Sequence, residues 1–332
     1  MRLGSCALIL FAQVAYGGLD KYSPLVVADK SPTTAAPTNA IRVTYLGVNG
    51  FQFENGNHTL LVDPYFSRIG FWSAALNRRI ESNPNRVAEG LRHLRGRADA
   101  VLITHAHFDH LLDVPLIMRR THAQLLAGST AVNLVESFGI RRSECDADKP
   151  GIVRRIGPWK IRILAAQHDR LFGKVPFDAC PSYRPLPPPS PSGRGGRDSA
   201  SEGKTLSMRP IKASDWCVGE PLAFVIEAAG KRIYIDSGGI PGYPPDAAVG
   251  HVDLAILGAA LPDSRHRFAE IVRQLQPRYI LPSHQDDFFG PVDRGFVFGK
   301  LTNFPALAQV YQKERLPGRL ILLDYFRPWT LP

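Results

Sequence analysis

The chain has 332 residues, of which 44% are hydrophobic, so it can bury a sizeable core. This composition excludes a chain that is too polar to fold. Its net charge of +10 at pH 7 favours anionic substrates, membrane headgroups or nucleic acid as partners. Because no zinc-finger, RNA-recognition or helix-turn-helix pattern accompanies this charge, we expect no specific nucleic-acid partner.

The N-terminus has the features of a short export signal. Arg2 gives a positive start, residues 6–16 are apolar, and Ala15 with the following glycines could frame a cleavage site. We therefore expect residues 1–18 to be a signal peptide and residues 19–40 a linker. The alternative is a frayed strand or helix that belongs to the folded domain.

Export would place the protein in the periplasm or outside the cell, and without a signal we expect it in the cytoplasm. Residues 3–6, which end in Cys6, resemble a lipoprotein box but lack the apolar segment that should precede one. A lipid anchor is therefore expected only if the true start lies upstream. The apolar run is too short to span a bilayer, and peripheral membrane contact is the membrane association that we expect.

From residue 41 onward the pattern predicts alternating strands and helices in one domain that extends to residue 332. Short runs rich in β-branched or aromatic residues, separated by Gly, Asn or Pro, predict strands, and longer amphipathic runs predict helices. The strands are expected at residues 41–47, 50–55, 58–64, 99–104, 124–127, 159–166, 222–227, 231–235, 252–257, 279–281 and 319–323. The helices are expected at residues 84–94, 111–120, 130–138, 265–275 and 304–314.

Residues 170–215 interrupt this pattern, because they are rich in Pro, Gly, Ser and charge and poor in apolar side chains. We interpret them as a surface insertion, which either covers the substrate or has no catalytic role. Cys180 and Cys217 flank the most irregular part of this stretch. They either form a disulfide in an oxidising compartment or remain reduced and buried.

A cluster of metal-binding side chains follows the predicted strand at 99–104. His105, His107, Asp109 and His110 lie within six residues of one another. Neutral imidazole nitrogens and carboxylate oxygens are the ligands that zinc and similar ions take in proteins. Four such donors at the end of a buried strand have no simple structural explanation, and they predict a metal site.

Three further donors follow predicted strands elsewhere in the chain: His168, Asp236 and His284. Singly, each has an ordinary explanation as a surface histidine or a turn residue. Their common position at strand ends favours one shared site with the first cluster. Such a site would hold more than one metal ion.

The ordered set His-x-His-x-Asp-His, a later His, a later Asp and a final His resembles the metallo-β-lactamase superfamily. This resemblance covers residue 41 to the C-terminus and implies an α/β fold, an αββα sandwich of two mixed sheets flanked by helices. It also implies the ligand set: one metal held by His105, His107 and His168, the other by Asp109, His110 and His284, and both bridged by Asp236.

The segments YLGVNGFQFE, TLLVDPYFS and RYILPSHQDDFF are similar to a branch with two named activities. These are L-ascorbate-6-phosphate lactonases and N-acyl-phosphatidylethanolamine-hydrolysing phospholipase D. The segment Val48-Asn49-Gly50 departs from the pattern of many relatives, which carry His-Ala or His-Ser there. Roles that relatives assign to this loop are therefore not transferred.

We expect a binuclear metal-dependent hydrolase in which a metal-bridging hydroxide attacks an ester, lactone or phosphodiester, with an anionic or lipid molecule as substrate. Asp109 or Asp236 would accept or relay the proton. We expect two zinc ions in this site, with manganese or iron as alternatives. Asp63 is a candidate for orienting a ligand, and His266 for contacting substrate.

Two other functions remain open on the same residues. The first is a β-lactamase or a thioesterase-type hydrolase, which would use the same metal site on a different acyl substrate. The second is a non-enzymatic exported binding protein that keeps the fold and a structural metal. The complete ligand set argues against the second alternative.

Overall fold

The computed structural model describes residues 18–30, 36–171, 173–180, 210–237, 249–259, 264–299, 302 and 304–332, with the side chains of helix α6 described from residue 267 onward. Residues 1–17 of the predicted signal peptide lie outside this part of the chain, as does the central stretch of the predicted 170–215 insertion. Within the described residues, no helix is both long and apolar enough to cross a membrane.

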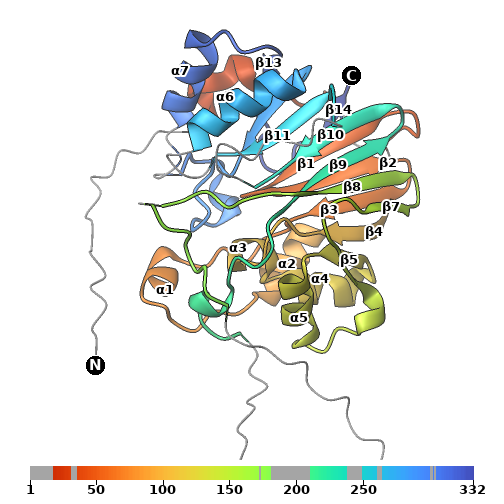
Figure 1. Cartoon of the computed structure of the whole chain (residues 1–332), viewed down its shortest axis with the longest axis vertical. Coiled ribbons are helices and arrows are strands. Elements are labelled where there is room, and N and C mark those ends of the chain that lie inside the picture. Colours follow the sequence, from red (N-terminus) through yellow and green to blue (C-terminus); the bar gives the residue numbers. More distant parts are fainter. Residues whose placement is uncertain are drawn as a thin grey trace, which may run out of the picture.

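Two seven-stranded sheets form the centre of the molecule (Figure 1). The first has the order β14-β1-β2-β3-β4-β5-β6. An antiparallel meander of β1, β2 and β3 leads into parallel neighbours from β3 to β6. Its strands are β1 (Ile41–Gly47), β2 (Gly50–Asn55), β3 (His58–Val62), β4 (Arg97–Leu102), β5 (Gln124–Ala127), β6 (Cys145–Ala147) and β14 (Trp329–Leu331).

The second sheet has the order β13-β12-β11-β10-β9-β8-β7. It is antiparallel from β7 to β10 and parallel from β10 to β13. Its strands are β7 (Val153–Ile156), β8 (Trp159–Ala165), β9 (Leu222–Ala228), β10 (Lys231–Ile235), β11 (Leu254–Gly258), β12 (Tyr279–Ser283) and β13 (Arg319–Leu320).

Helices cover the outer faces of the two sheets (Figure 1). The helices on the side of the first sheet are α1 (Phe71–Ala75), α2 (Pro84–Leu91), α3 (Phe108–Leu111), α4 (Val114–Thr121) and α5 (Ser129–Glu136), and those on the side of the second are α6 (Ser264–Leu275) and α7 (Phe304–Lys313). Short 3₁₀ turns lie at η1 (Leu19–Leu25), η2 (Arg142–Glu144), η3 (Ala213–Asp215) and η4 (Val292–Arg294). This αββα sandwich confirms the predicted fold class.

Alternation along the strands divides the core into two layers. In β3, Leu60 and Val62 pack between the two sheets, whereas Leu61 between them packs under the helices. The next strand repeats the pattern, with Leu102 facing the second sheet and Val101 facing the helices. Successive side chains of a strand point to opposite faces, so both faces of the first sheet are buried.

The predicted helix at 111–120 is divided in the structure into α3 and α4. Asp113 lies at the break, where its carboxylate accepts hydrogen bonds from the backbone N–H groups of Phe66 and Ser67, both at 2.7 Å. Pro115 follows and has no N–H to donate, which favours a new helix start at this point. The division orients α3 separately, and α3 carries Asp109 and His110.

Several short elements have no counterpart in the sequence prediction: α1, β6, β7 and β14. Each has five residues or fewer, which is too short for a repeating pattern of apolar and polar side chains to stand out in the sequence. The predicted strand at 99–104 begins earlier, at Arg97, and ends at Leu102. Its last two predicted residues therefore belong to the loop that leads to the histidines.

Of the three cysteines in the described residues, Cys180 and Cys217 form a disulfide and Cys145 is a buried free thiol. The structure thus decides between the two alternatives left open for the cysteine pair. The bond joins Cys180, within the predicted insertion, to Cys217, two residues beyond its end, and closes a sequence separation of 37 residues.

Cys145 is expected to resist alkylation in the folded protein. Burial raises the pKa of its thiol to about 12, and the reactive species is the thiolate, which at pH 8 would be roughly one part in 10⁴. Peptide mass mapping after iodoacetamide treatment should find Cys145 unmodified in buffer and modified in urea. The same map should recover Cys180 and Cys217 as linked peptides, and rapid native labelling of Cys145 would contradict its burial.

Candidate metal centre

The predicted donors all follow strand ends, as the sequence suggests. The loop after β4 carries His105 and His107 and continues into α3. His168 follows β8, and His284 follows β12. In the second sheet β8 is antiparallel to β9, which is antiparallel to β10, so β8 runs in the same direction as the parallel strands β10 to β12. The carboxyl ends of strands that run in the same direction lie at one edge of a sheet, and this arrangement brings the donors together.

The structure brings six of the seven predicted ligands into two groups. Within each group the candidate ligand atoms lie within 4.8 Å of one another. The groups are His105, His107 and His168 in the first, and Asp109, His110 and His284 in the second. This division is the one that the family resemblance implies.

The first group is a triangle of imidazole rings. The ring centroids of His105, His107 and His168 are 4.6 to 4.7 Å apart, and neighbouring rings are inclined by 71° to 80°. The Nε2 atom of His105 lies 2.9 Å from Nδ1 of His107. Ring nitrogens that converge in this way suit tetrahedral metal coordination with one position left open.

Burial keeps the first group neutral. It holds the pKa values of His105 and His107 well below the ordinary 6.5, and the neighbouring imidazoles lower them further. Burial also lowers the pKa of His168 to about 4. Since only a neutral imidazole can donate a lone pair to a metal, these three side chains are in the state that coordination requires.

The second group contains one carboxylate, that of Asp109. Burial alone would raise the pKa of the Asp109 carboxyl, but His110 and His284 outweigh it and lower that pKa. Burial likewise opposes protonation of His110, yet Asp63 and Asp109 raise its pKa. The two carboxylates thus favour a positive charge at His110. A divalent cation bound beside His110 would supply that positive charge in place of a proton. The donor sets of both groups fit divalent metal ions.

Asp63 holds His110 in place, which supports the orienting role predicted for it. Its Oδ2 atom lies 2.8 Å from Nδ1 of His110, which leaves Nε2 to face the second group. The same carboxylate accepts hydrogen bonds from the backbone and hydroxyl of Thr104 at 2.8 and 2.5 Å and from Asn49 at 2.8 Å. A carboxylate behind a ligating histidine fixes its tautomer and ring orientation.

The Asp63→Asn variant is expected to bind metal about 10- to 100-fold more weakly, as is usual when such a partner is lost. An amide has one acceptor oxygen and cannot serve all the donors that surround Asp63. Isothermal titration with zinc measures the change. Asp99→Asn is the matched control, because Asp99 lies 3.0 Å from Nδ1 of His58, outside both groups. Equal zinc affinity in both variants would contradict this role.

His284 occupies a strained backbone position. Its φ of +59° lies in the left-handed region, and its N–H donates to the carbonyl of Val48 at 2.6 Å. Its Nε2 atom lies 3.2 Å from Oδ2 of Asp109. Strain of this kind persists where the surrounding structure fixes the residue, and here it aims a ligand at the centre.

The structure does not bring the Asp236 carboxylate into either group found among the described residues. One oxygen accepts hydrogen bonds from Arg267 at 2.7 Å and Tyr234 at 3.0 Å, and the other accepts from the N–H of Gly258 at 3.1 Å. The next residue, Ser237, places its hydroxyl 3.5 Å from Nε2 of His110. The bridging and catalytic roles of Asp236 stay predictions.

The side chain of His266 lies outside the described residues, so its substrate role also stays a prediction. Sequence reasoning missed Arg267, which donates to Asp236, and Ser237, whose hydroxyl lies beside His110. It also missed the carbonyl of Pro176, which lies 3.0 Å from Nε2 of His107. Nothing in the sequence signals a backbone carbonyl or a buried arginine of this kind.

Comparisons with known proteins agree with the observed fold. Residues 42–179 match the model of the beta-lactamase superfamily domain. The chain also resembles Igni18, a metallo hydrolase from the archaeon Ignicoccus hospitalis, with a TM-score of 0.53 and 16% identity over 88% of this chain and 99% of that one. The chain has the metallo-β-lactamase fold. The specific lactonase and phospholipase branch stays a prediction.

Relatives in sequence carry names that agree with the site. A UPF0173 metal-dependent hydrolase from Rubrobacter xylanophilus is 26% identical over 74% of this chain and 82% of its own length. A second, from Chelativorans, is 28% identical over 40% of this chain and 51% of its own length, so that match spans about half of the relative. The homologues of this metallo-β-lactamase-fold chain are thus named metal-dependent hydrolases.

The fold alone does not fix the reaction. CmlA, a diiron β-hydroxylase from Streptomyces venezuelae, resembles this chain with a TM-score of 0.53 and 15% identity over 91% of this chain and 55% of that one. The same architecture therefore supports different chemistries, and function has to be argued from the site.

Proposed function

We propose that this chain is a binuclear metal-dependent hydrolase acting on an ester, lactone or phosphodiester that carries an apolar group. The observation that carries the proposal is the pair of buried donor groups, His105, His107 and His168 beside Asp109, His110 and His284. Divalent ions held there would supply an activated water nucleophile and polarise the scissile carbonyl or phosphoryl group. Zinc suits these donors, and manganese or iron are alternatives.

The protein's own residues provide the rest of the chemistry. The low pKa of Asp109 keeps its carboxylate ionised, so its Oδ2 atom can hold a proton only transiently, as a relay requires. Asp63 and the carbonyl of Val48 fix His110 and His284 before substrate arrives. Such preorganisation avoids the cost of rearranging the site during the reaction.

An aromatic series leads from the metal centre to the surface and supports an apolar substrate. Phe288 packs against His284 with a centroid distance of 5.2 Å and against Phe289 at 4.0 Å. Phe289 lies 5.3 Å from Phe71 of α1, which lies 5.2 Å from Trp72. The last two side chains are 50% and 58% exposed, whereas the other aromatic side chains in the described part of the chain are buried or half-buried.

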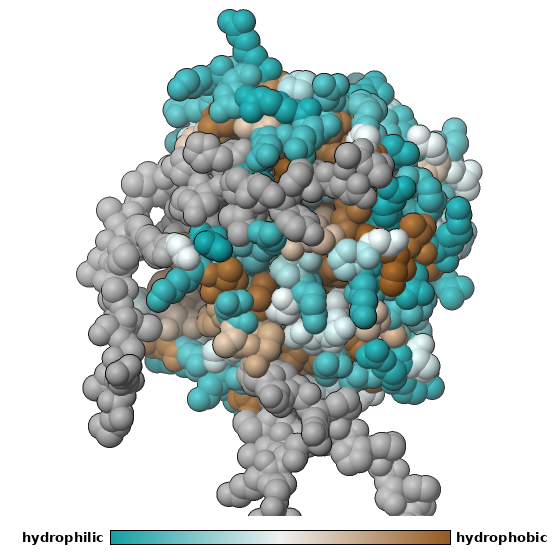
Figure 2. All heavy atoms as spheres, in the orientation of Figure 1, coloured by the Kyte–Doolittle hydropathy of each residue, from teal (hydrophilic) through white to brown (hydrophobic). Residues whose placement is uncertain are grey.

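The exposed part of this aromatic series belongs to α1. Figure 2 shows hydrophobic side chains at the surface on the side of the molecule where Figure 1 places α1. Exposed apolar groups beside a polar centre fit an acyl or lipid portion of a substrate, or a peripheral membrane surface that presents it. Export, which the N-terminal segment predicts, agrees with a disulfide in the folded domain.

A metal analysis coupled to a substrate panel tests the proposal. We expect elemental analysis of protein loaded at pH 7.5 to find about two ions per chain. We expect metal-dependent turnover of p-nitrophenyl esters that rises with acyl length, or of bis-p-nitrophenyl phosphate. Turnover of a chromogenic cephalosporin alone would favour a β-lactamase. A metal-free protein that keeps full stability in chelator would overturn the proposal.

A further inference from the structure

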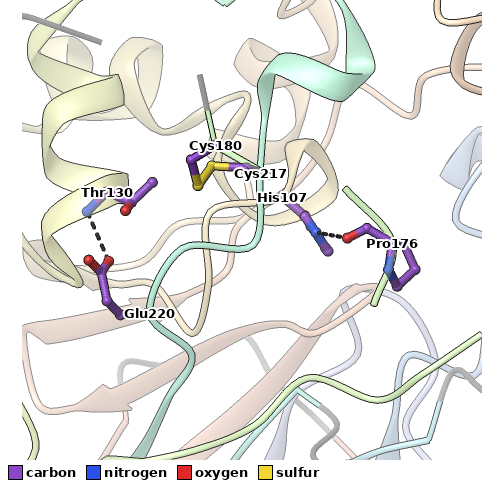
Figure 3. The surroundings of a disulfide bond; sticks show 6 residues. All are labelled: His107, Thr130, Pro176, Cys180, Cys217 and Glu220. Atoms are coloured by element: carbon purple, nitrogen blue, oxygen red, sulfur yellow. Dashed lines mark hydrogen bonds between the residues drawn. A yellow bond between two sulfur atoms is a disulfide. The ribbon is translucent and has the colours of Figure 1, made fainter. Parts of the chain in front are cut away.

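The Cys180–Cys217 disulfide lies beside the metal centre. It joins the segment 173–180, which follows His168, to the segment that leads into β9 (Figure 3). The same view shows His107 pointing toward Pro176 of the first segment. The disulfide thus fixes a segment that contacts a candidate metal ligand directly.

The contact between Pro176 and His107 sets the tautomer of the histidine. Nε2 of His107 lies 3.0 Å from the carbonyl oxygen of Pro176, and a carbonyl only accepts, so Nε2 must carry the proton. Nδ1 then holds the lone pair, and it faces Nε2 of His105 at 2.9 Å. The Pro176 carbonyl therefore aims the coordinating nitrogen of His107 into the first donor group.

One side of the disulfide is firmly anchored. Cys217 and its neighbour Trp216 are fully buried, and the carboxylate of Glu220 accepts a hydrogen bond from the N–H of Thr130 in α5 at 2.9 Å (Figure 3). The carbonyl of Val218 accepts from the N–H of Ala106, in the histidine loop, at 3.0 Å. This segment is tied both to a helix and to the loop of ligands.

The other side of the disulfide is held through Phe177, whose ring lies 6.4 Å from that of Phe108 in α3. The backbone N–H of Val218 donates to the carbonyl of Phe177 at 3.1 Å, and the Phe177 ring lies 6.0 Å from that of His107. In the sequence Pro176 lies between the Leu171–Lys174 turn and Cys180, and this turn is closed by its own hydrogen bonds. The disulfide is the covalent link between the segment that bears Pro176 and the anchored one.

We propose that the Cys180–Cys217 disulfide is a positioning element of the metal centre, which holds the Pro176 carbonyl on His107 and thereby strengthens metal binding at His105, His107 and His168. The inference rests on the proposed metal-dependent function and adds a redox dependence to it. Reduction by a phosphine and water converts the disulfide to two thiols and the phosphine to its oxide, with two electrons transferred. The Pro176 segment then loses its covalent anchor.

The Cys180→Ser/Cys217→Ser double variant tests the inference without adding thiols that could bind metal. Its zinc affinity is measured by competition with a chromogenic chelator, and the His107 tautomer is measured by ¹⁵N NMR of metal-free protein. We expect one of two zinc ions to bind about 10- to 100-fold more weakly, as for other outer partners of ligating histidines. We also expect the His107 ring to lose its single Nε2–H tautomer.

Phosphine treatment provides the matched control. It should lower zinc affinity in the wild-type protein after the phosphine is removed, and it should change nothing in the double variant. If the double variant fails to fold, as judged by circular dichroism, the reduced wild-type protein decides the question. Unchanged affinity and tautomer after reduction would overturn this inference alone, whereas a wild-type protein that binds no metal would overturn the proposed function as well.

Discussion

The His105→Ala/His107→Ala double variant is expected to lose one metal ion and all hydrolytic activity above background. These two side chains supply two of the three donors in the first group, and their ring nitrogens lie 2.9 Å apart. A single remaining histidine cannot hold a divalent ion against water. Elemental analysis should therefore fall from about two ions per chain to at most one, and ester or phosphodiester turnover should disappear with it.

The stability of this variant gives a second measurement. Metal that binds only the folded state raises the unfolding temperature of the wild-type protein, and most of that rise should be absent in the variant. His251→Ala is the matched control, because His251 is exposed and belongs to neither donor group. A double variant that keeps two ions and normal turnover would remove the basis for assigning the metal centre to these residues.

The sequence pointed to the six donors that the structure brings together because they combine two local signals. A run such as DAVLIT predicts a buried strand, and a polar cluster such as His105 to His110 at its end has no packing purpose. The fold class followed from the same strand and helix pattern together with the family resemblance. Each of these signals is local, since it is read from one strand and the residues that follow it.

The remaining contacts at the centre depend on residues that are far apart in sequence. The direction of the Asp236 carboxylate is set by Arg267 on α6, which donates to it at 2.7 Å. The contact of Pro176 with His107 uses a backbone carbonyl, which every residue possesses, so no side-chain pattern marks it. Strand β14 has three residues, and it exists because β1 pairs with it across almost the whole chain.

The positioning of His284 depends on a buried ion pair of the same long-range kind. Arg68 donates to Asp286 at 2.8 Å, and neither side chain is exposed. Asp286 also accepts from the hydroxyl groups of Tyr45 at 2.8 Å and Tyr325 at 2.6 Å. Its hydrogen bond from the N–H of Val48, at 2.9 Å, fixes the turn whose carbonyl accepts the His284 N–H.

The Asp286→Asn variant is therefore expected to lose stability and metal affinity together. Removing one charge from a buried pair costs about 3–5 kcal/mol, because the other charge, here on Arg68, stays buried without a counterion. For a chain of this size the cost lowers the unfolding temperature by roughly 4–7 °C. Calorimetry of the metal-free protein measures this shift without any contribution from bound metal.

Metal binding by the same variant distinguishes a positioning role from a merely structural one. Val48 and His284 both have left-handed backbone angles, with φ of +56° and +59°, and Asp286 holds the first of them directly. Loosening this turn should weaken the second group, so zinc titration should show one weaker ion even well below the unfolding temperature. The matched control is Asp287→Asn, because Asp287 accepts from the N–H of Phe289 and forms no ion pair among the described residues. A variant that melts early yet binds both ions normally would limit Asp286 to supporting the fold.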